Sequence, residues 1–116
     1  MLFKIAESLA TSIEEHTGID AAPVWYDDGI IEVDSGIFML KCELCGNNLV
    51  VCEIDVQRYH QGDNLGRALV MAFCQICREF RLVPAAREVQ PEAEGFWNKL
   101  GFRPCADGDD YYEFIQ

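Results

Sequence analysis

The sequence predicts a single α+β domain, in which an antiparallel meander is followed by a β-α-β crossover. Three observations lead to this fold class. The 116 residues are enough for one hydrophobic core but not for two. Apolar residues recur at helical spacing in long segments, and short apolar runs separated by turns lie between them. Two of the expected strands flank the second helical segment, which favours parallel neighbours joined by a right-handed crossover.

The first half of the chain is expected to hold one helix and then a meander. Apolar residues form one stripe over residues 2–16, and Gly18 is a suitable C-terminal stop for this helix. Strands follow between Trp25 and Val56, and the turn-rich sequence between them predicts the strands 30–33, 37–43 and 49–56. Strict alternation in the last strand places two sets of side chains on opposite faces: Val50, Cys52, Ile54 and Val56, and Val51, Glu53 and Asp55.

The second half is expected to alternate between helices and strands. The sequence predicts a helix over 65–80, a strand over 82–89, a helix over 91–100 and a final strand pair at 102–105 and 111–115. Pro91 in the first turn and Gly101 after the last turn are strong end signals for the third helix. No repeat, low-complexity tract or linker interrupts the chain, so residues 1–116 are treated as one domain.

Charge excludes some classes of partner. The chain has 20 acidic and 9 basic residues, a net charge of −11, and residues 1–57 alone carry eleven acids and two bases. Such a chain repels phosphate backbones, so nucleic-acid binding is not expected, whereas a cationic partner would be attracted. Residues 58–103 carry seven bases and five acids, and this locally basic middle could hold an anionic cofactor.

No apolar run is long enough to cross a bilayer, and the N-terminus lacks the pattern of a signal peptide. We therefore expect a cytoplasmic protein with no membrane partner.

The six cysteines allow two interpretations. They stand at positions 42, 45, 52, 74, 77 and 105. Cys42 and Cys45, followed by Gly46, together with Cys74 and Cys77 can be written as a four-cysteine zinc site. Cys74 and Cys77 also lie on the apolar stripe of a predicted helix, which favours buried free thiols and no metal.

The segment from Gln61 to Arg67 joins a strand to a helix. It contains the small residues Gly62, Asp63, Asn64 and Gly66, together with Gln61, Leu65 and Arg67. Small residues at the start of a helix leave backbone N–H groups open to an anion at the positive end of the helix dipole. The alternative is a plain strand-to-helix turn.

This segment and a later one resemble the GCN5-related N-acetyltransferase (GNAT) superfamily. The family's pyrophosphate loop is Gln/Arg-x-x-Gly-x-Gly/Ala. Gln61 and Gly66 occupy its outer positions here, and Asn64 stands where the first glycine is usual. The second signature is matched by Ala93 and by the run Phe96-Trp97-Asn98-Lys99-Leu100-Gly101-Phe102. The resemblance covers residues 49–105 and extends to the N-terminal half by topology only.

The resemblance implies a mixed GNAT-like sheet and an acetyl-CoA cosubstrate. The backbone of Ile54, Asp55 and Val56 would pair with the pantetheine arm, and N–H groups from Gln61 to Arg67 would hold the pyrophosphate. The helix from Pro91 would cover the thioester end, and Gln90 stands where an asparagine that contacts the cofactor is often found.

The implied reaction is direct transfer of an acetyl group to an amine of a cationic acceptor, either a small molecule or a lysine. It needs donors at the developing oxyanion, which backbone amides near Ile54 could supply, and a base. Glu53 is the candidate base, because burial would raise the pKa of its carboxyl; the alternative is that Glu53 pairs with an arginine or faces solvent. Trp97 stands where many relatives carry the tyrosine that protonates the thiolate, so Tyr111, Tyr112 or Cys105 would replace it, or no acid is needed.

Two further hypotheses remain open at this level. The first is a GNAT-like binding or regulatory protein that has lost catalysis and engages a basic partner, and the second is a zinc-stapled adaptor. Dimers are common in the family, so a homodimer is one arrangement to expect.

Overall fold

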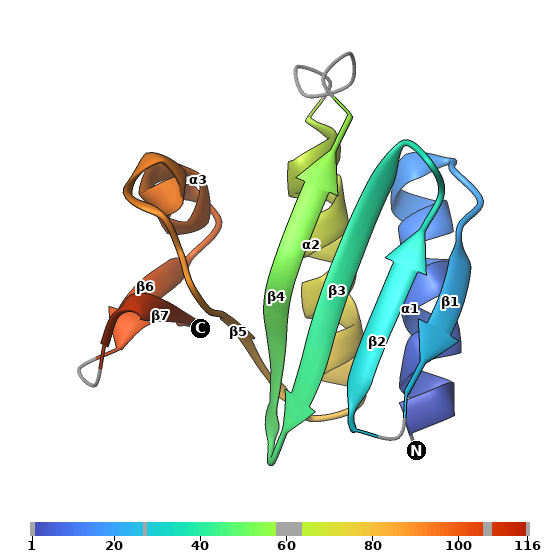
Figure 1. Cartoon of the computed structure of the whole chain (residues 1–116), viewed down its shortest axis with the longest axis horizontal. Coiled ribbons are helices and arrows are strands. Elements are labelled where there is room, and N and C mark those ends of the chain that lie inside the picture. Colours follow the sequence, from blue (N-terminus) through green and yellow to red (C-terminus); the bar gives the residue numbers. More distant parts are fainter. Residues whose placement is uncertain (1, 27, 58–63, 106–107, 116) are drawn as a thin grey trace.

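The computed structural model describes residues 2–26, 28–57, 64–105 and 108–115 (Figure 1). Its helices and strands, in chain order, are α1 (Leu2–Thr17), β1 (Ala22–Trp25), β2 (Ile30–Asp34), β3 (Phe38–Cys45), β4 (Asn48–Val56), α2 (Leu65–Glu79), β5 (Val83–Ala86), the 3-10 turn η2 (Pro91–Ala93), α3 (Glu94–Lys99), β6 (Phe102–Cys105) and β7 (Gly108–Phe114). None of the described helices is both long and apolar enough to cross a membrane.

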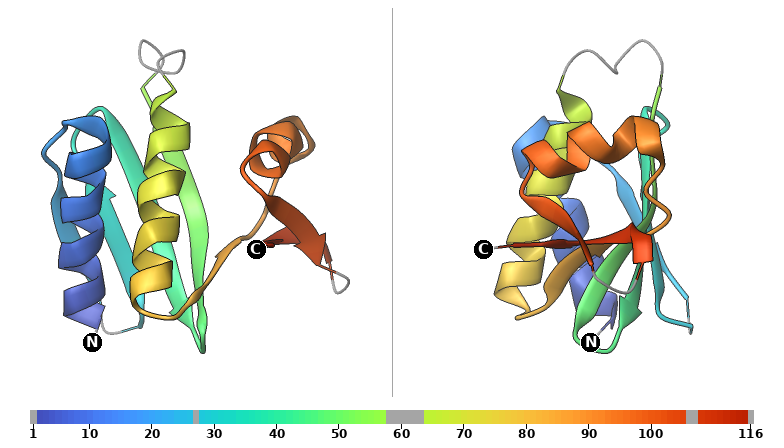
Figure 2. Two further views of the ribbon diagram at one scale, coloured as in Figure 1. Left: turned by 180° about the vertical axis from the view of Figure 1, so that it is seen from behind. Right: turned by 90° about the vertical axis from the view of Figure 1, so that its left-hand side faces the viewer.

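The strands form one mixed sheet. Within the described residues its order is β1-β2-β3-β4-β5-β7-β6, with β4 and β5 parallel and the other neighbours antiparallel. The parallel pair is joined through α2, as the sequence predicted. Helices α1 and α2 lie side by side on one face of the sheet, and Figure 2 shows both from that side. The opposite face of β2, β3 and β4 is not covered by any described helix (Figure 1).

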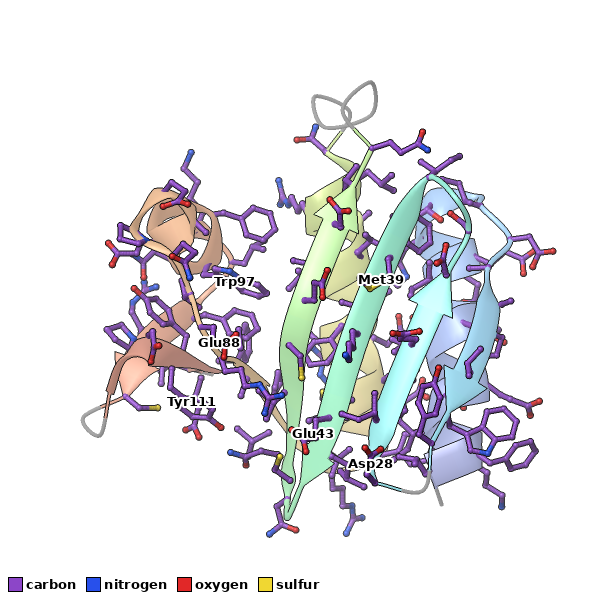
Figure 3. The ribbon with its side chains drawn as sticks, in the orientation of Figure 1. Asp28, Met39, Glu43, Glu88, Trp97 and Tyr111 are labelled. Carbon is purple, nitrogen blue, oxygen red and sulfur yellow. The ribbon has the colours of Figure 1, made fainter. Side chains whose placement is uncertain are left out.

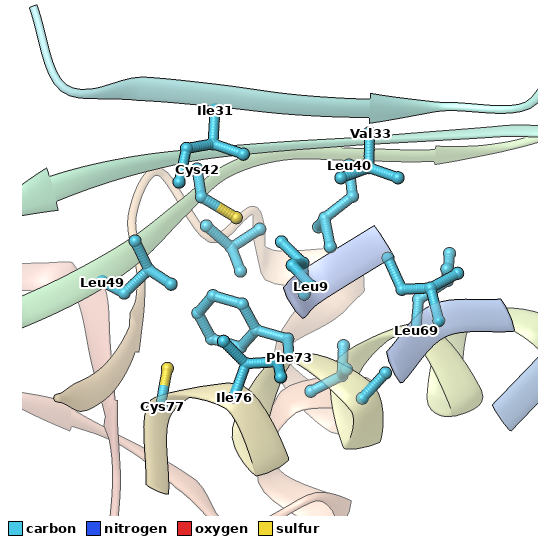
Figure 4. Close-up of a cluster of buried hydrophobic side chains, with 14 of the residues drawn as sticks. Leu9, Ile31, Val33, Leu40, Cys42, Leu49, Leu69, Phe73, Ile76 and Cys77 are labelled. Carbon is cyan, nitrogen blue, oxygen red and sulfur yellow. The ribbon is translucent and has the colours of Figure 1, made fainter. Parts of the chain in front are cut away.

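The core lies between the sheet and the two helices. Leu9 of α1 and Phe73 of α2 are fully buried against Ile31 and Leu40 of the sheet (Figure 4). A single buried polar side chain occurs in the described core, that of Ser12, and its hydroxyl donates to the carbonyl oxygen of Ala72 at 3.3 Å. This hydrogen bond ties α1 to α2 within an otherwise apolar contact.

The C-terminal elements form a smaller lobe beside the sheet. The rings of Trp97, Phe102 and Phe114 stack edge to face, with centroid distances of 4.9 Å and 5.5 Å, and hold α3 against β6 and β7. Strand β7 attaches this lobe to the sheet by pairing with Ala85 and Ala86 of β5. Figure 1 shows the lobe separated from β4 along the upper half of that strand.

Several element bounds differ from those predicted. Strand β1 was missed before Trp25, because Pro23 argues against a strand and is tolerated here only because β1 is an edge strand. Strand β5 ends at Ala86, before Glu88 takes a left-handed conformation with φ 56°, so the predicted strand to Val89 is too long. The helix predicted over 91–100 is divided into η2 and α3, and β7 begins at Gly108 rather than Tyr111.

The predicted alternation along β4 is wrong at one point. A β-bulge interrupts the pairing, so that Lys41 is opposite Glu53 while its neighbour Cys42 is opposite Val51. The extra residue in β4 is Cys52. The bulge reverses the alternation of side chains along β4 at this point. Val51 was predicted to share a face with Glu53 and Asp55, but it lies on the helix-covered face together with Ile54.

Candidate functional site

The outer edge of β4 loses its strand partner halfway along. Strand β5 pairs with Asn48 to Val51 of β4, and among the described residues no strand pairs with that edge beyond Val51. The two parallel strands then diverge. A sheet edge of this kind exposes backbone donors and acceptors that can pair with an extended ligand.

The β-bulge decides which backbone groups face this open edge. The N–H of Gln57 donates to the carbonyl oxygen of Ile37 at 2.8 Å, so Gln57 points toward β3. Backbone direction alternates along a strand, and pairing after the bulge is regular, so Asp55 and Glu53 also point toward β3. The N–H and C=O of Ile54 consequently point away from β3, into the space that β5 leaves.

The start of α2 lies close to this edge. Asn64 precedes the helix in the left-handed conformation, with φ 60°, which asparagine tolerates better than most residues. Its side chain makes no capping hydrogen bond, and the first turn carries no acidic residue. The first N–H groups of α2 have no acceptor within the helix and lie at the positive end of its dipole. Gln61, Gly62 and Asp63 lie outside the described residues.

A groove of about 1210 Å³ joins these two features. It is lined by β4, by the start of α2 and by one side of η2 and α3. Six residues predicted as cofactor-binding lie along it: Ile54, Asp55, Val56, Asn64, Gly66 and Arg67. Side chains of α3 complete the wall, among them Phe96 and Lys99, which the sequence placed only as part of a covering helix. Two predicted residues do not line it: the Leu65 side chain is buried in the core, and Gln90 is exposed and donates to the carbonyl oxygen of Glu88.

A second cavity, of about 590 Å³, continues from this groove along α2. The two share Arg67, Lys99 and Leu100, and the second adds Arg78 and Glu79. The second cavity therefore has three cations, Arg67, Arg78 and Lys99, and one carboxylate, that of Glu79, in a chain whose net charge is −11. In the groove, Arg67 and Lys99 are balanced by Asp55 and Glu92, so the end of the groove that opens into the second cavity favours an anionic group.

Glu53 lies on the opposite side of β4 from the core. Its side chain is exposed, so the expectation of a buried Glu53 is wrong and the solvent-facing alternative is what the structure has. The bulge places it on the uncovered face, directly opposite Lys41. It is nevertheless the immediate neighbour of Ile54, whose backbone faces the open edge.

The candidate acids differ in their surroundings. Trp97 is 4 % exposed and packs between Phe96 and Phe102, so its role is in the core of the C-terminal lobe. Tyr112 is also buried. The Tyr111 hydroxyl accepts a hydrogen bond from Nδ2 of Asn48 at 2.8 Å, at the start of β4 (Figure 3). Burial raises the pKa of Tyr111, although the hydrogen bond from Asn48 opposes the rise.

The cysteines of the zinc hypothesis do not share one site. Cys42 is buried in β3, whereas Cys45 is exposed at the end of the same strand. Burial raises the pKa of the Cys42 and Cys77 thiols, which identifies them as small apolar core residues in the protonated form. No group of three or more potential metal ligands occurs among the described residues.

Comparisons with known proteins give matches at the level of structure only. No protein-family model matches the chain, and no curated protein matches its sequence. A mutant AtaT toxin, bound to the C-terminus of the antitoxin AtaR and to acetyl-CoA, is similar over 73% of this chain and 66% of that chain, with 14% identity and a TM-score of 0.58. The match thus spans slightly less than two thirds of that protein.

Two further solved structures match a larger share of the chain. The PaiA N-acetyltransferase of Thermoplasma acidophilum in complex with coenzyme A is similar over 92% of this chain and 68% of that chain, with 13% identity and a TM-score of 0.57. The ribosomal-protein-S18-alanine N-acetyltransferase of Escherichia coli is similar over 89% and 72%, with 14% identity and a TM-score of 0.53. At these identities the likeness concerns the fold. The chain has the fold of the GCN5-related N-acetyltransferase superfamily.

Proposed function

We propose that the chain is an N-acetyltransferase that takes an acetyl group from acetyl-CoA and passes it directly to an amine of a cationic acceptor. The observation that carries this proposal is the backbone of Ile54, which faces the gap left where β5 diverges from β4 and which lines the 1210 Å³ groove. An extended pantetheine arm can pair with such an edge in the manner of an added strand.

The other end of the groove suits the nucleotide. The N–H groups at the start of α2 and the cations Arg67 and Lys99 offer hydrogen bonds and positive charge to a diphosphate. Asn64 stays compatible with this role, because its left-handed backbone opens the helix as a glycine would.

The chain's own groups can assist acyl transfer. The thioester supplies the activated acetyl group when acetyl-CoA is bound. The N–H of Ile54 is placed to donate to the carbonyl oxygen as negative charge develops on it. Glu53, next to Ile54 and open to solvent, takes the proton from the acceptor ammonium, directly or through a water.

The uncovered face of the sheet supports a cationic acceptor. Strands β2, β3 and β4 present five carboxylates on this face, and within the described residues Glu43 alone among them forms an ion pair with an arginine, Arg87. They are Glu32, Asp34, Glu43, Glu53 and Asp55. Figure 3 shows Met39 and Glu43 on this face of β3. An ammonium group is attracted to such a surface and would reach the open edge of β4 beside Glu53.

The direct test has two steps. Acetyl-CoA is expected to raise the melting temperature of the chain, and release of free thiol from acetyl-CoA is expected to increase when polyamines or lysine-rich peptides are added. Acidic amines, such as glutamate, serve as the acceptor control, because they offer an amine without a net positive charge. Absence of any response to CoA would contradict the proposal.

A second candidate is a binding protein of the same fold that engages a basic partner without catalysis. It is favoured by Trp97, which is buried where many relatives carry a tyrosine acid. Stabilisation by acetyl-CoA without thiol release against any amine would favour this second function.

A further inference from the structure

A row of charged side chains crosses the uncovered face of the sheet beside the proposed reaction site. Glu32 of β2 is opposite Lys41 of β3, and Lys41 is opposite Glu53 of β4. Directly opposed side chains on one face of an antiparallel pair have Cβ atoms about 5 Å apart. Lys41 is therefore flanked by two carboxylates, one of which is the proposed base.

Lys41 stands in β3 at the last paired position before the bulge in β4. The pKa of the Cys52 thiol is raised by burial, and nearby positive charges, that of Arg87 and then that of Lys41, oppose the rise. Cys52 is the extra residue of the bulge, and Ile54 follows two residues later. One inter-strand spacing of about 4.8 Å separates β3 from β4, so the extended four-carbon stem of Lys41 has to pass over β4 to approach the open edge on its other side.

The other lysines have different surroundings. Lys4 is exposed on α1, on the far side of the core from this face, and Lys99 lies on α3 at the rim of the groove. Lys41 is half-buried and is the one lysine on the described strands of the uncovered face. It combines a nucleophilic amine, an adjacent carboxylate and proximity to the open edge of β4.

We propose that Lys41 is a self-acetylation site, which accepts the acetyl group of acetyl-CoA within the same chain. The inference rests on the proposed function. In the step, the Lys41 ammonium loses one proton to Glu53, directly or through a water, and Nζ attacks the acetyl carbon. As the amide bond forms and the thioester C–S bond breaks, the second proton that Nζ loses passes to the sulfur, which leaves as free CoA thiol.

The modification has a direct electrostatic consequence. Acetylation removes the positive charge between Glu32 and Glu53 and leaves the uncovered face more negative. The acetylated chain would therefore attract a cationic acceptor more strongly than the unmodified one.

The experiment uses the full chain and acetyl-CoA without an added acceptor, followed by peptide mapping by mass spectrometry. Lys41 is expected to be acetylated at least about ten times faster than Lys4, because general-base catalysis by Glu53 accelerates the reaction at Lys41 only. Its rate constant is expected to be independent of the chain concentration, because donor and acceptor share one molecule. Equal acetylation of all three lysines, or the same pattern in the urea-unfolded chain, would show ordinary chemical acylation and overturn the inference.

Matched variants distinguish the role of Lys41 as the acceptor from the roles of the two neighbouring carboxylates. Lys41→Arg is expected to abolish the modification and Lys4→Arg to leave it unchanged. Glu53→Gln is expected to slow it at least about tenfold, and Glu32→Gln to change it by less than about twofold. Equal effects of the two glutamate variants would show that Glu53 acts only through its charge and would contradict the step as written.

The melting temperature in the presence of CoA distinguishes failure of this inference from failure of the proposed function. Lys41→Arg should be stabilised by CoA as the parent chain is, since its side chain does not line the groove. If CoA stabilises the chain and added amines release thiol while Lys41 stays unmodified, self-acetylation is wrong and the transferase stands. If CoA has no effect, both fail.

Discussion

At the end of α3, Gly101 has a φ of 97°, a left-handed conformation that side chains rarely adopt. A Cβ at this position would lie 2.9 Å from Cε1 of Phe114, which is part of the aromatic stack of the C-terminal lobe. Gly101→Ala is therefore expected to destabilise the chain by about 1–3 kcal/mol, through backbone strain and displacement of that ring. Urea unfolding followed by tryptophan fluorescence measures the loss.

Gly95 provides the matched control for this substitution. It lies inside α3, and a Cβ there would meet nothing within 4 Å. Gly95→Ala is expected to leave stability unchanged or to raise it by up to about 1 kcal/mol, because alanine favours a helix over glycine. Equal destabilisation by the two variants would show that the strain at Gly101 is not the cause.

Single residues also show where sequence reasoning stops. Asn64 was expected to tolerate a positive φ, and the structure confirms it, because that preference is local to the residue. The exposure of Glu53 was not predictable in the same way. It depends on a bulge between β3 and β4 and on the absence of a covering helix among the described elements, and neither leaves a pattern in the residues around Glu53.

Among the elements, the start of α2 gives a prediction in which stability and binding change in opposite directions. Gly66 lies in the first turn with its φ outside the left-handed region, and a Cβ there would be 3.5 Å from the Phe96 ring, an ordinary contact. Gly66→Ala is expected to stabilise the free chain by up to about 1 kcal/mol. The same methyl group enters the groove and should weaken CoA binding about tenfold, because it keeps a diphosphate from the backbone.

Thermal unfolding without ligand and calorimetric titration with CoA measure the two effects separately. Ala68→Gly is a suitable comparison in the same helix, because it lowers helix propensity without adding a group to the groove. A Gly66→Ala chain that binds CoA as tightly as the parent would place the diphosphate elsewhere and would contradict the proposed site.

Elements were predictable where periodicity is strong. α1 and α2 were predicted to within one residue at each end, because each presents a full apolar stripe to the same core. The parallel pairing of β4 and β5 followed from the crossover between them. β1 was missed because a proline is unusual in a strand, and Pro23 is tolerated in β1 because that strand pairs only with β2. The length of β5 was overestimated because glutamate at position 88 does not indicate a left-handed backbone.

For the whole molecule, the fold and the position of the groove were predictable to different degrees. The element order and the two short signatures indicated the superfamily fold, which the structural comparisons bear out. The groove itself required the divergence of β5 from β4 and the placement of α3 against α2, both set by packing over the full chain. Its side chains on α3, such as Phe96 and Lys99, therefore could not be singled out from the sequence.

Two thiols of α2, that of the half-buried Cys74 and that of the buried Cys77, predict how the stability of the molecule depends on alkaline pH. Burial raises the pKa of the Cys74 thiol from 9.0 to about 11, and burial raises that of Cys77 as well. Above pH 9.0 the folded chain keeps a proton on Cys74 that the unfolded chain loses. The contribution of Cys74 to the free energy of unfolding is therefore fully present below that pH. It is lost as the pH rises through about 11, at a cost on the order of 2 kcal/mol.

The melting temperature measured from pH 8 to pH 11 checks this dependence. Tyrosine and lysine side chains also titrate in this window, so the informative quantity is the difference between a variant and the parent chain. Cys74→Ala is expected to lose less stability between pH 9 and pH 11 than the parent, whereas Cys45→Ala, which removes an exposed thiol, should follow the parent closely. An identical decline for all three chains would mean that Cys74 ionises in the folded protein as freely as in the unfolded one, and would contradict the effect of its partial burial on the pKa of its thiol.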